Sequence, residues 1–151
     1  MHVVILSGMN AECTSNYLKM NGFGDHAVFE NQICRYTKVL NGSPTRITIW
    51  IMLNTKLTQY MLKSIEYRIV HVVFLYHASK PITLIRALGW FRLFEVGDRN
   101  MVLCSTQPTT PHPTVAYSKL IESIADKFKT YDGKIIPHYS VSFNKLIKLF
   151  E

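Results

Sequence analysis

Long hydrophobic runs are absent from this sequence. The longest nearly apolar run, Ile69–Tyr76, is interrupted by His71 and is less than half of the ~18 residues that a membrane-spanning helix requires. The opening segment, MHVVILSGMN, has no basic flank and only four apolar residues in succession. It therefore predicts a first β-strand and argues against a secretory signal.

Cysteine is also scarce, with three residues at positions 13, 34 and 104. An odd, widely spaced set forms neither a disulfide framework nor a zinc-ligand spacing, which favours a reducing, intracellular setting. The six histidines show no H-x-x-x-H or Cys/His spacing, so no metal site is expected. Because no cysteine follows Cys104, we expect no C-terminal prenyl group and no membrane anchor.

Acidic residues are few: 10 Asp and Glu stand against 17 Lys and Arg, a net charge of +7. The excess is concentrated between Asn31 and Phe94, where nine basic residues accompany one acid, Glu66, so that this stretch carries +8. Such a field favours an acidic protein surface or a polyanion as partner. The nine basic residues are Arg35, Lys38, Arg46, Lys56, Lys63, Arg68, Lys80, Arg86 and Arg92.

What the sequence does contain is typical of one globular domain over residues 1–151, since 48% of it is hydrophobic and 18% charged. Runs of β-branched residues alternate with segments of helical spacing. This pattern predicts an α/β fold with a mostly parallel sheet, one antiparallel hairpin strand and helices on both faces. Phe74 and Trp90 are expected in its core.

The predicted strands are His2–Ser7, Gln32–Leu40, Thr45–Met52, Val70–Tyr76, Met101–Cys104 and Lys134–Tyr139. The predicted helices are Thr14–Met20, Leu57–Arg68, Ile82 to before Gly97, Val115–Phe128 and Phe143–Phe150. The three prolines of Thr106–Pro113 indicate a loop, and Asn41-Gly42 indicates the hairpin turn.

The first strand and the residues after it, VVILSGMNAECTSNYL, are similar to a phosphate-binding loop of pattern G-x-x-x-x-G-K-[ST]. Gly8 stands at its first glycine, Cys13 at the second, Thr14 at the lysine and Ser15 at the hydroxyl. With the hairpin LNGSPTRITIW, the segment EYRIVHVVFLYHASKP and Trp90, nearly the whole chain resembles a Ras-superfamily small GTPase of the Rab-like branch. The resemblance implies a three-layer fold of the P-loop NTPase type.

The residues that carry nucleotide chemistry in that family are missing from this chain. Thr14 lacks the lysine charge that bridges the β- and γ-phosphates, and Cys13 adds a side chain where the backbone must approach them. Residues 50–54, at the position of W-D-x-x-G, read WIMLN, without the magnesium aspartate or the γ-phosphate glycine. Residues 105–108 read STQP in place of the guanine-reading N-K-x-D.

We interpret this loss as that of a pseudo-GTPase, with no enzymatic activity, no catalytic residues and no cofactor. Gly8, Cys13, Thr14 and Ser15 form a vestigial nucleotide pocket in this interpretation. Binding of a single phosphate ion at this turn is left open by the sequence, because the N-terminus of a helix can bind an anion without a lysine. The resemblance also implies a final helix shorter than the family's and an absent lipidated tail.

By the resemblance, the basic stretch falls on the surface through which small GTPases bind their effectors. The expected function is therefore nucleotide-independent docking by a scaffold, adaptor or mimic. Its basic face would meet an acidic protein surface, for example that of a regulator or effector of authentic small GTPases. The residues expected to contact this partner are Arg35, Lys38, Arg46, Lys56, Lys63 and Arg68.

Two other functions are left open by the sequence. An unorthodox GTPase or ATPase would need Glu12, Asp25 or Glu30 as replacement magnesium ligands. A basic nucleic-acid or anionic-membrane binding protein would follow from the charge alone. Against nucleic acid, no RNA-binding signature is present and the basic residues are interleaved with core positions. His77 and His138, at predicted strand ends near the vestigial pocket, are expected to fill space or bond a carbonyl.

Overall fold

The computed structural model describes residues 2–20, 28–30, 33–40, 43–51, 71–93, 100–106 and 115–140. Side chains are described in residues 3–10, 12–20, 71–93, 100–106 and 115–140. The strands are β1 His2–Ser7, β2 Val28–Glu30, β3 Ile33–Leu40, β4 Ser43–Ile51, β5 His71–Tyr76, β6 Asn100–Ser105 and β7 His138–Ser140. The helices are α1 Ala11–Met20, α3 Pro81–Leu93 and α4 Val115–Ala125.

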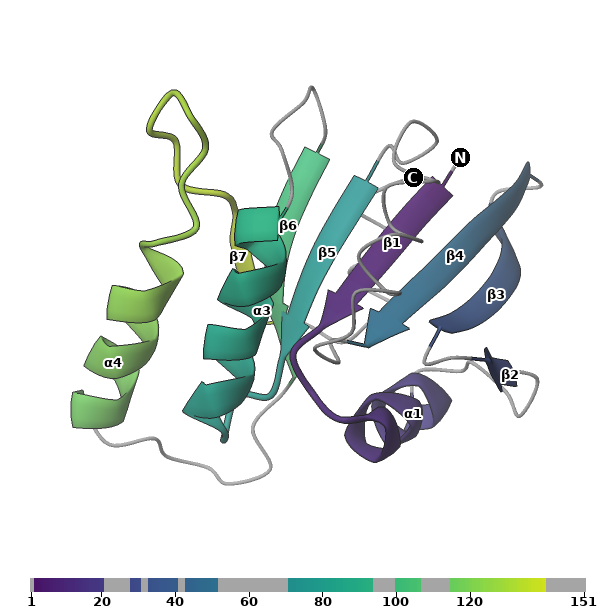
Figure 1. Cartoon of the computed structure of the whole chain (residues 1–151), viewed down its shortest axis with the longest axis horizontal. Coiled ribbons are helices and arrows are strands. Elements are labelled where there is room, and N and C mark those ends of the chain that lie inside the picture. Colours follow the sequence, from purple (N-terminus) through teal and green to yellow (C-terminus); the bar gives the residue numbers. More distant parts are fainter. Residues whose placement is uncertain are drawn as a thin grey trace.

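The described strands form one seven-stranded sheet in the order β2-β3-β4-β1-β5-β6-β7 (Figure 1). Strands β4, β1, β5, β6 and β7 run parallel to one another, whereas β3 is antiparallel to β4 and to β2. The hairpin register runs from the pair Leu40 and Ser43 to the pair Ile33 and Trp50. The predicted α/β class with a mostly parallel sheet and an antiparallel hairpin is confirmed. The short edge strand β2 was not predicted.

The central strands are buried on both faces, as parallel strands between two helical layers must be. Val3–Leu6 on β1 are at most 3% exposed, and Val72–Tyr76 on β5 at most 2%. Successive side chains of a strand point to opposite faces, so both faces need apolar residues. This is the reason that these strands are unbroken apolar runs in the sequence.

One face of the sheet is covered by α3 and α4, which lie side by side in Figure 1. Phe74 of β5, Phe91 of α3 and Phe128 form an aromatic cluster there, with ring centroids 5.1 to 5.9 Å apart. Trp90 is 1% exposed and Phe74 is completely buried, so the prediction that both belong to the core is confirmed.

Helix α1 lies beyond the carboxyl ends of the strands in Figure 1, and its second half reaches the side of the sheet opposite α3. On β6, Leu103 belongs to the core under α3, so the next residue, Cys104, lies on the other face. Burial and the neighbouring Cys104 raise the pKa of Tyr17 on α1, and Leu18 beside it is 2% exposed. Among the described residues, the predicted cover of helices on both faces is therefore confirmed for the face under α3 and α4 alone. Within the described ranges, no helix is both long enough and apolar enough to cross a membrane.

Two helix boundaries differ from the prediction. α1 begins at Ala11 and not at Thr14, because Asn10 caps it. α4 ends at Ala125 and not at Phe128, since the N–H groups of the next turn bond carbonyls three residues back and turn Phe128 into the core. The predicted helices Leu57–Arg68 and Phe143–Phe150, and all of the loop Thr106–Pro113 except its first residue, lie outside the described residues.

The predicted last strand, Lys134–Tyr139, is wrong in its first half. Lys129 and Ile135 form an isolated antiparallel bridge, and the chain turns back between them through Gly133, whose φ is 81°. Pro137 has no N–H for a sheet ladder. The strand β7 therefore begins only after this proline.

The aromatic cluster predicts where truncation is costly. Phe128→Ala removes a fully buried ring that contacts two others, and we expect it to lower the free energy of unfolding by about 3 to 5 kcal/mol. Tyr131→Ala is the matched control, because that side chain is 96% exposed, and its effect should stay within about 0.5 kcal/mol. Urea unfolding of both variants measures the difference, and equal costs would contradict the packing described.

Candidate functional site

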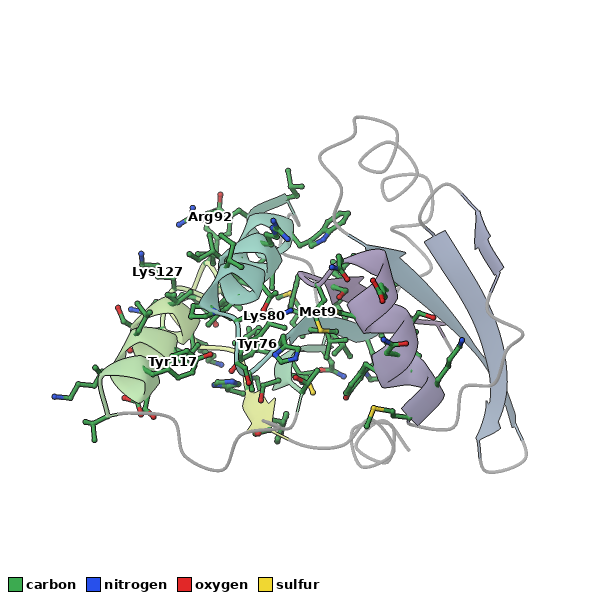
Figure 2. The ribbon with its side chains drawn as sticks, turned by 90° about the horizontal axis from the view of Figure 1, so that it is seen from below. Met9, Tyr76, Lys80, Arg92, Tyr117 and Lys127 are labelled. Atoms are coloured by element: carbon green, nitrogen blue, oxygen red, sulfur yellow. The ribbon has the colours of Figure 1, made fainter. Side chains whose placement is uncertain are left out.

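The candidate site is the turn after β1. In open parallel sheets, ligands bind beyond the carboxyl ends of the strands, where successive connections leave in opposite directions. Here this point is the end of β1, which has β4 on one side and β5 on the other. The predicted pocket residues Gly8, Cys13, Thr14 and Ser15 follow β1 directly. Figure 2 looks from below onto this edge of the sheet, with Met9 labelled near its middle.

Three hydrogen bonds in series close the turn. The Met9 N–H donates to Ser7 Oγ at 3.1 Å. The hydroxyls of Ser7 and Thr14 are 2.9 Å apart, and Thr14 Oγ1 donates to the Asn10 carbonyl at 2.8 Å. Because the Thr14 proton is used on Asn10, the Ser7 hydroxyl is the donor to Thr14. Ser7 and Thr14 are both 0% exposed, so these bonds are shielded from solvent.

Asn10 ends the turn after only three residues. Its Oδ1 accepts the Cys13 N–H at 2.8 Å, the geometry of a helix N-cap, and its carbonyl accepts the Thr14 N–H at 3.0 Å. The alignment with a phosphate-binding loop requires five residues, Gly8–Glu12, before the helix. The observed turn is therefore shorter than the loop that the resemblance implies.

Helix α3 is packed directly against the turn. A Cβ on Gly8 would lie 1.9 Å from the Thr83 carbonyl oxygen, so only glycine permits this approach. The Gly8 N–H donates to the Leu75 carbonyl at 2.8 Å, and Trp90 Nε1 donates to the Ser7 carbonyl at 3.3 Å. The turn is thus held by β5 and α3 as well as from within.

The four predicted pocket residues lie in the turn after β1 and in the first two turns of α1. Gly8 and Thr14 lie on either side of Ser7, and Thr14, at the position of the lysine, turns its hydroxyl inward. Cys13 is half-buried in the first turn of α1, and Ser15 is half-buried in the second. Each of the backbone N–H groups of Gly8, Met9, Cys13 and Thr14 has an acceptor within the chain.

A second polar cluster lies at the carboxyl ends of β5 and β6. The Tyr76 hydroxyl is 2.6 Å from His138 Nε2. Burial raises the pKa of Tyr76 to about 12, although a hydrogen bond with Ser105 acts in the opposite direction. Burial lowers the pKa of His138. Both groups are therefore neutral near pH 7, and the phenol donates to the imidazole.

Tyr117 of α4 and Thr106 close the same edge. The Tyr117 hydroxyl donates to the Ala78 carbonyl, and the Ala78 N–H donates to Thr106 Oγ1 at 3.2 Å. In the alignment, Ser105 and Thr106 stand where guanine would be read; both are buried. Gln107 and Pro108 lie outside the described residues.

The histidine predictions are answered in part. His138 bonds a phenol and not a carbonyl, and His77 Nδ1 accepts the backbone N–H of Ser79 at 3.1 Å. No sequence motif marks Tyr76 or Tyr117. The only signal for Tyr76 was its place at the end of a predicted strand, and Tyr117 carried none.

Of the six predicted partner-binding residues, Arg35, Lys38 and Arg46 are described, and only through their backbone. Arg35 pairs with Thr48, and Arg46 pairs with Thr37 two residues further along β3, so Arg35 and Arg46 occupy positions of one sheet face. Lys38 occupies a position of the other face. One continuous patch on the hairpin therefore does not include all three. Lys56, Lys63 and Arg68 lie outside the described residues.

Of the three replacement magnesium ligands, Glu12 alone has a described side chain. Glu12 is exposed on α1, Glu30 is described only as backbone in β2, and Asp25 lies outside the described residues. Among the residues that the structure describes, no group of three His, Cys, Asp or Glu side chains lies close enough to hold a metal ion.

Comparison with known proteins adds no assignment: no family model matches the chain, and no curated protein shows significant similarity to it.

The hydroxyl chain predicts a specific cost at Thr14. Thr14→Val keeps the volume but leaves the Ser7 hydroxyl without its acceptor, and should lower the free energy of unfolding by about 1 to 3 kcal/mol. Thr14→Ser keeps the hydroxyl and should cost about 1 kcal/mol or less. Ser7→Ala combined with Thr14→Val should cost less than the sum of the single changes. Urea unfolding tests this order, and a serine variant as unstable as the valine variant would contradict it.

The Tyr76–His138 bond predicts a pH dependence. Because the pKa of His138 is lowered on folding, the unfolded chain takes up its proton first as the pH falls. The stabilisation from this bond should be complete above about pH 6.5 and be lost as the pH falls towards the lowered folded value.

The measurement is the difference in unfolding free energy between the wild type and His138→Gln at several pH values. The pKa values of His71 and His77 are also lowered by burial, but both residues are present in either protein and cancel in the difference. A difference that stays constant between about pH 7.5 and 5 would show that His138 does not titrate in this way.

Proposed function

We propose that the protein is a nucleotide-independent interaction module, a pseudo-GTPase that keeps a small-GTPase-like fold as a docking scaffold. The observation that carries this proposal is the closed turn after β1. A phosphate-binding loop works by aiming free backbone N–H groups and a lysine at the β- and γ-phosphates. In this chain the N–H groups of Gly8, Met9, Cys13 and Thr14 are bonded internally, and the residue at the lysine position is a buried threonine.

Opening the turn for a nucleotide would break the bonds that close it. The N–H groups of Gly8 and Met9 would leave the Leu75 carbonyl and Ser7 Oγ, and the Ser7–Thr14 pair would separate. Buried polar groups left unpaired cost about 1 to 3 kcal/mol each. Without the lysine charge, a nucleotide has no compensating contact at this position.

The edge where a guanine base would be read supports the same proposal. The Tyr117 hydroxyl and Thr106 Oγ1 are both bonded to the backbone of Ala78, and Tyr76 is bonded to His138. These side chains tie α4, β5, β6 and β7 together at the end of the sheet. Their polar atoms serve the fold and are not free for a ligand.

The α/β sheet is compatible with the P-loop type of fold that the resemblance implies. Its order places β1 between the hairpin and the β5–β7 half, so the closed turn stands at the position where P-loop proteins hold phosphate. A scaffold that has given up this site can serve only through its surface. The net charge of +7 favours an acidic protein as partner, such as a regulator or effector of authentic small GTPases.

The nucleotide proposal is tested by thermal unfolding of the purified protein with GDP, GTP or ATP at about 1 mM, with and without Mg²⁺. A ligand at 100 times its Kd adds about 2.7 kcal/mol and would raise the Tm of a domain of this size by several degrees. We expect no shift and no nucleotide carried through purification.

An authentic small GTPase in the same buffers is the positive control. A shift of several degrees that is abolished by Ser15→Ala with Glu12→Ala would reject the proposal and establish the unorthodox GTPase or ATPase instead. A shift that survives this double change would also reject it and would place the nucleotide elsewhere on the chain.

A further inference from the structure

The outer face of α3 is apolar, although it is exposed. Ile82, Ile85 and Leu93 on this face are 52%, 51% and 42% exposed. At 100° per residue they fall within one arc of about 80°, together with Gly89. Single exposed apolar residues are ordinary, but this stripe lies opposite a fully packed inner face, so α3 is apolar on two opposite sides. That pattern is typical of a helix with a partner on both sides.

Arginine side chains border this stripe on its two edges. On the helical wheel, Arg86 follows the apolar arc on one side and Arg92 on the other, and both are exposed. Lys80, directly before the helix, is exposed as well, and α3 itself contains no acidic residue. Figure 2 shows Lys80 and Arg92 at opposite ends of α3.

We infer that the outer face of α3 is a docking surface for an amphipathic helix of another protein whose apolar stripe is flanked by Asp and Glu. The apolar residues would supply the contact area, and the arginines would select acidic flanks and fix the orientation. This inference goes beyond the proposed function, because it concerns α3 alone and holds whether or not the protein binds a nucleotide.

Charge decides against two other occupants. A second copy of the chain would bring Arg86 and Arg92 against the same residues of the other α3, with no acid on either helix to compensate. An anionic membrane would also meet α4, the neighbour of α3, and the turn after it, where the exposed Lys119 and Lys127 are matched by the exposed Glu122 and Asp126, so that this segment adds no net attraction. A helix is narrow enough to contact the α3 stripe and its arginines alone.

The surface is already in its binding conformation. The inner residues Leu84, Ala87 and Leu88 are at most 5% exposed in the core, and Trp90 is bonded to the turn after β1. A partner helix would therefore meet a fixed stripe and would lose little free energy to ordering α3.

The test uses two labelled, alanine-rich helical peptides of about five turns. Both carry leucines at helical spacing, flanked by Glu in one peptide and by Lys in the other. Fluorescence anisotropy with the full chain should give saturable binding of the acidic peptide and binding at least about tenfold weaker for the basic one. Absence of binding of the acidic peptide, or equal binding of both, would overturn the inference.

Matched variants show whether the peptide binds at α3. Ile85→Ser should weaken binding about tenfold or more, whereas Ile135→Ser should not, although both isoleucines are 51% exposed. Arg86→Glu should likewise weaken binding, whereas Lys119→Glu on α4, with the same change in net charge, should not. Equal losses in a variant and its control would overturn the assignment to α3.

Two further measurements exclude the other occupants. Sedimentation equilibrium of the protein alone should show a monomer, and a dimer that Ile85→Ser dissociates would assign the stripe to a second copy and overturn the inference. Co-sedimentation with phosphatidylcholine vesicles containing about a quarter phosphatidylserine should be weak. Binding to these vesicles that Ile85→Ser abolishes would assign the stripe to a membrane and would also overturn it.

Discussion

The approach of α3 to the end of β1 is the contact on which the rest of this structure depends. At Gly8 a single Cβ would lie 1.9 Å from the backbone of α3, so strand and helix meet with no side chain between them. This closeness lets Trp90 reach the Ser7 carbonyl from α3, while the Ser7 hydroxyl continues through Thr14 into the first turn of α1. One residue thus joins the central strand to α3 on one face of the sheet and to α1 beyond its carboxyl edge. The same constraint leaves no open loop at the point of the sheet where ligands of α/β proteins usually bind.

The elements that follow from local chemistry could be predicted. β1 and β5 are apolar runs rich in valine and are buried on both faces, and Asn41-Gly42 stands in the sequence between two strands that pair antiparallel. The exact ends of elements could not, because single contacts set them. Asn10 ends the turn after β1 by capping α1, and Pro137 delays β7. Secondary-structure propensity, averaged over a window of residues, reveals neither the Asn10 cap nor the delay of β7 by Pro137.

The place of the candidate site in the sequence could be predicted, but the burial and hydrogen bonds of its side chains could not. Similarity to a phosphate-binding loop led to Gly8 and Thr14, and the loss of the lysine indicated an eroded pocket. It did not indicate that Thr14 would be buried and bonded to Ser7, since that depends on a turn two residues shorter than the motif. The bonds of Tyr76 and Tyr117 join residues 62 and 39 positions apart. Contacts over such separations leave no trace in a single sequence.

A closed turn and an apolar outer face on the same helix have a common physical basis. In a nucleotide-responsive switch, segments near the phosphate must change position, so the elements beside them cannot be bonded rigidly to the turn. Here α3 is fixed to that turn through Gly8 and Trp90, and its inner face is fully packed. A fixed helix is unsuited to switching but well suited to presenting a constant surface. The free energy needed to order its residues is lost when the protein folds and not when a partner binds. The proposed loss of a nucleotide site and the proposed docking role for α3 are therefore compatible, because a helix that does not move with a bound nucleotide presents the same surface at all times.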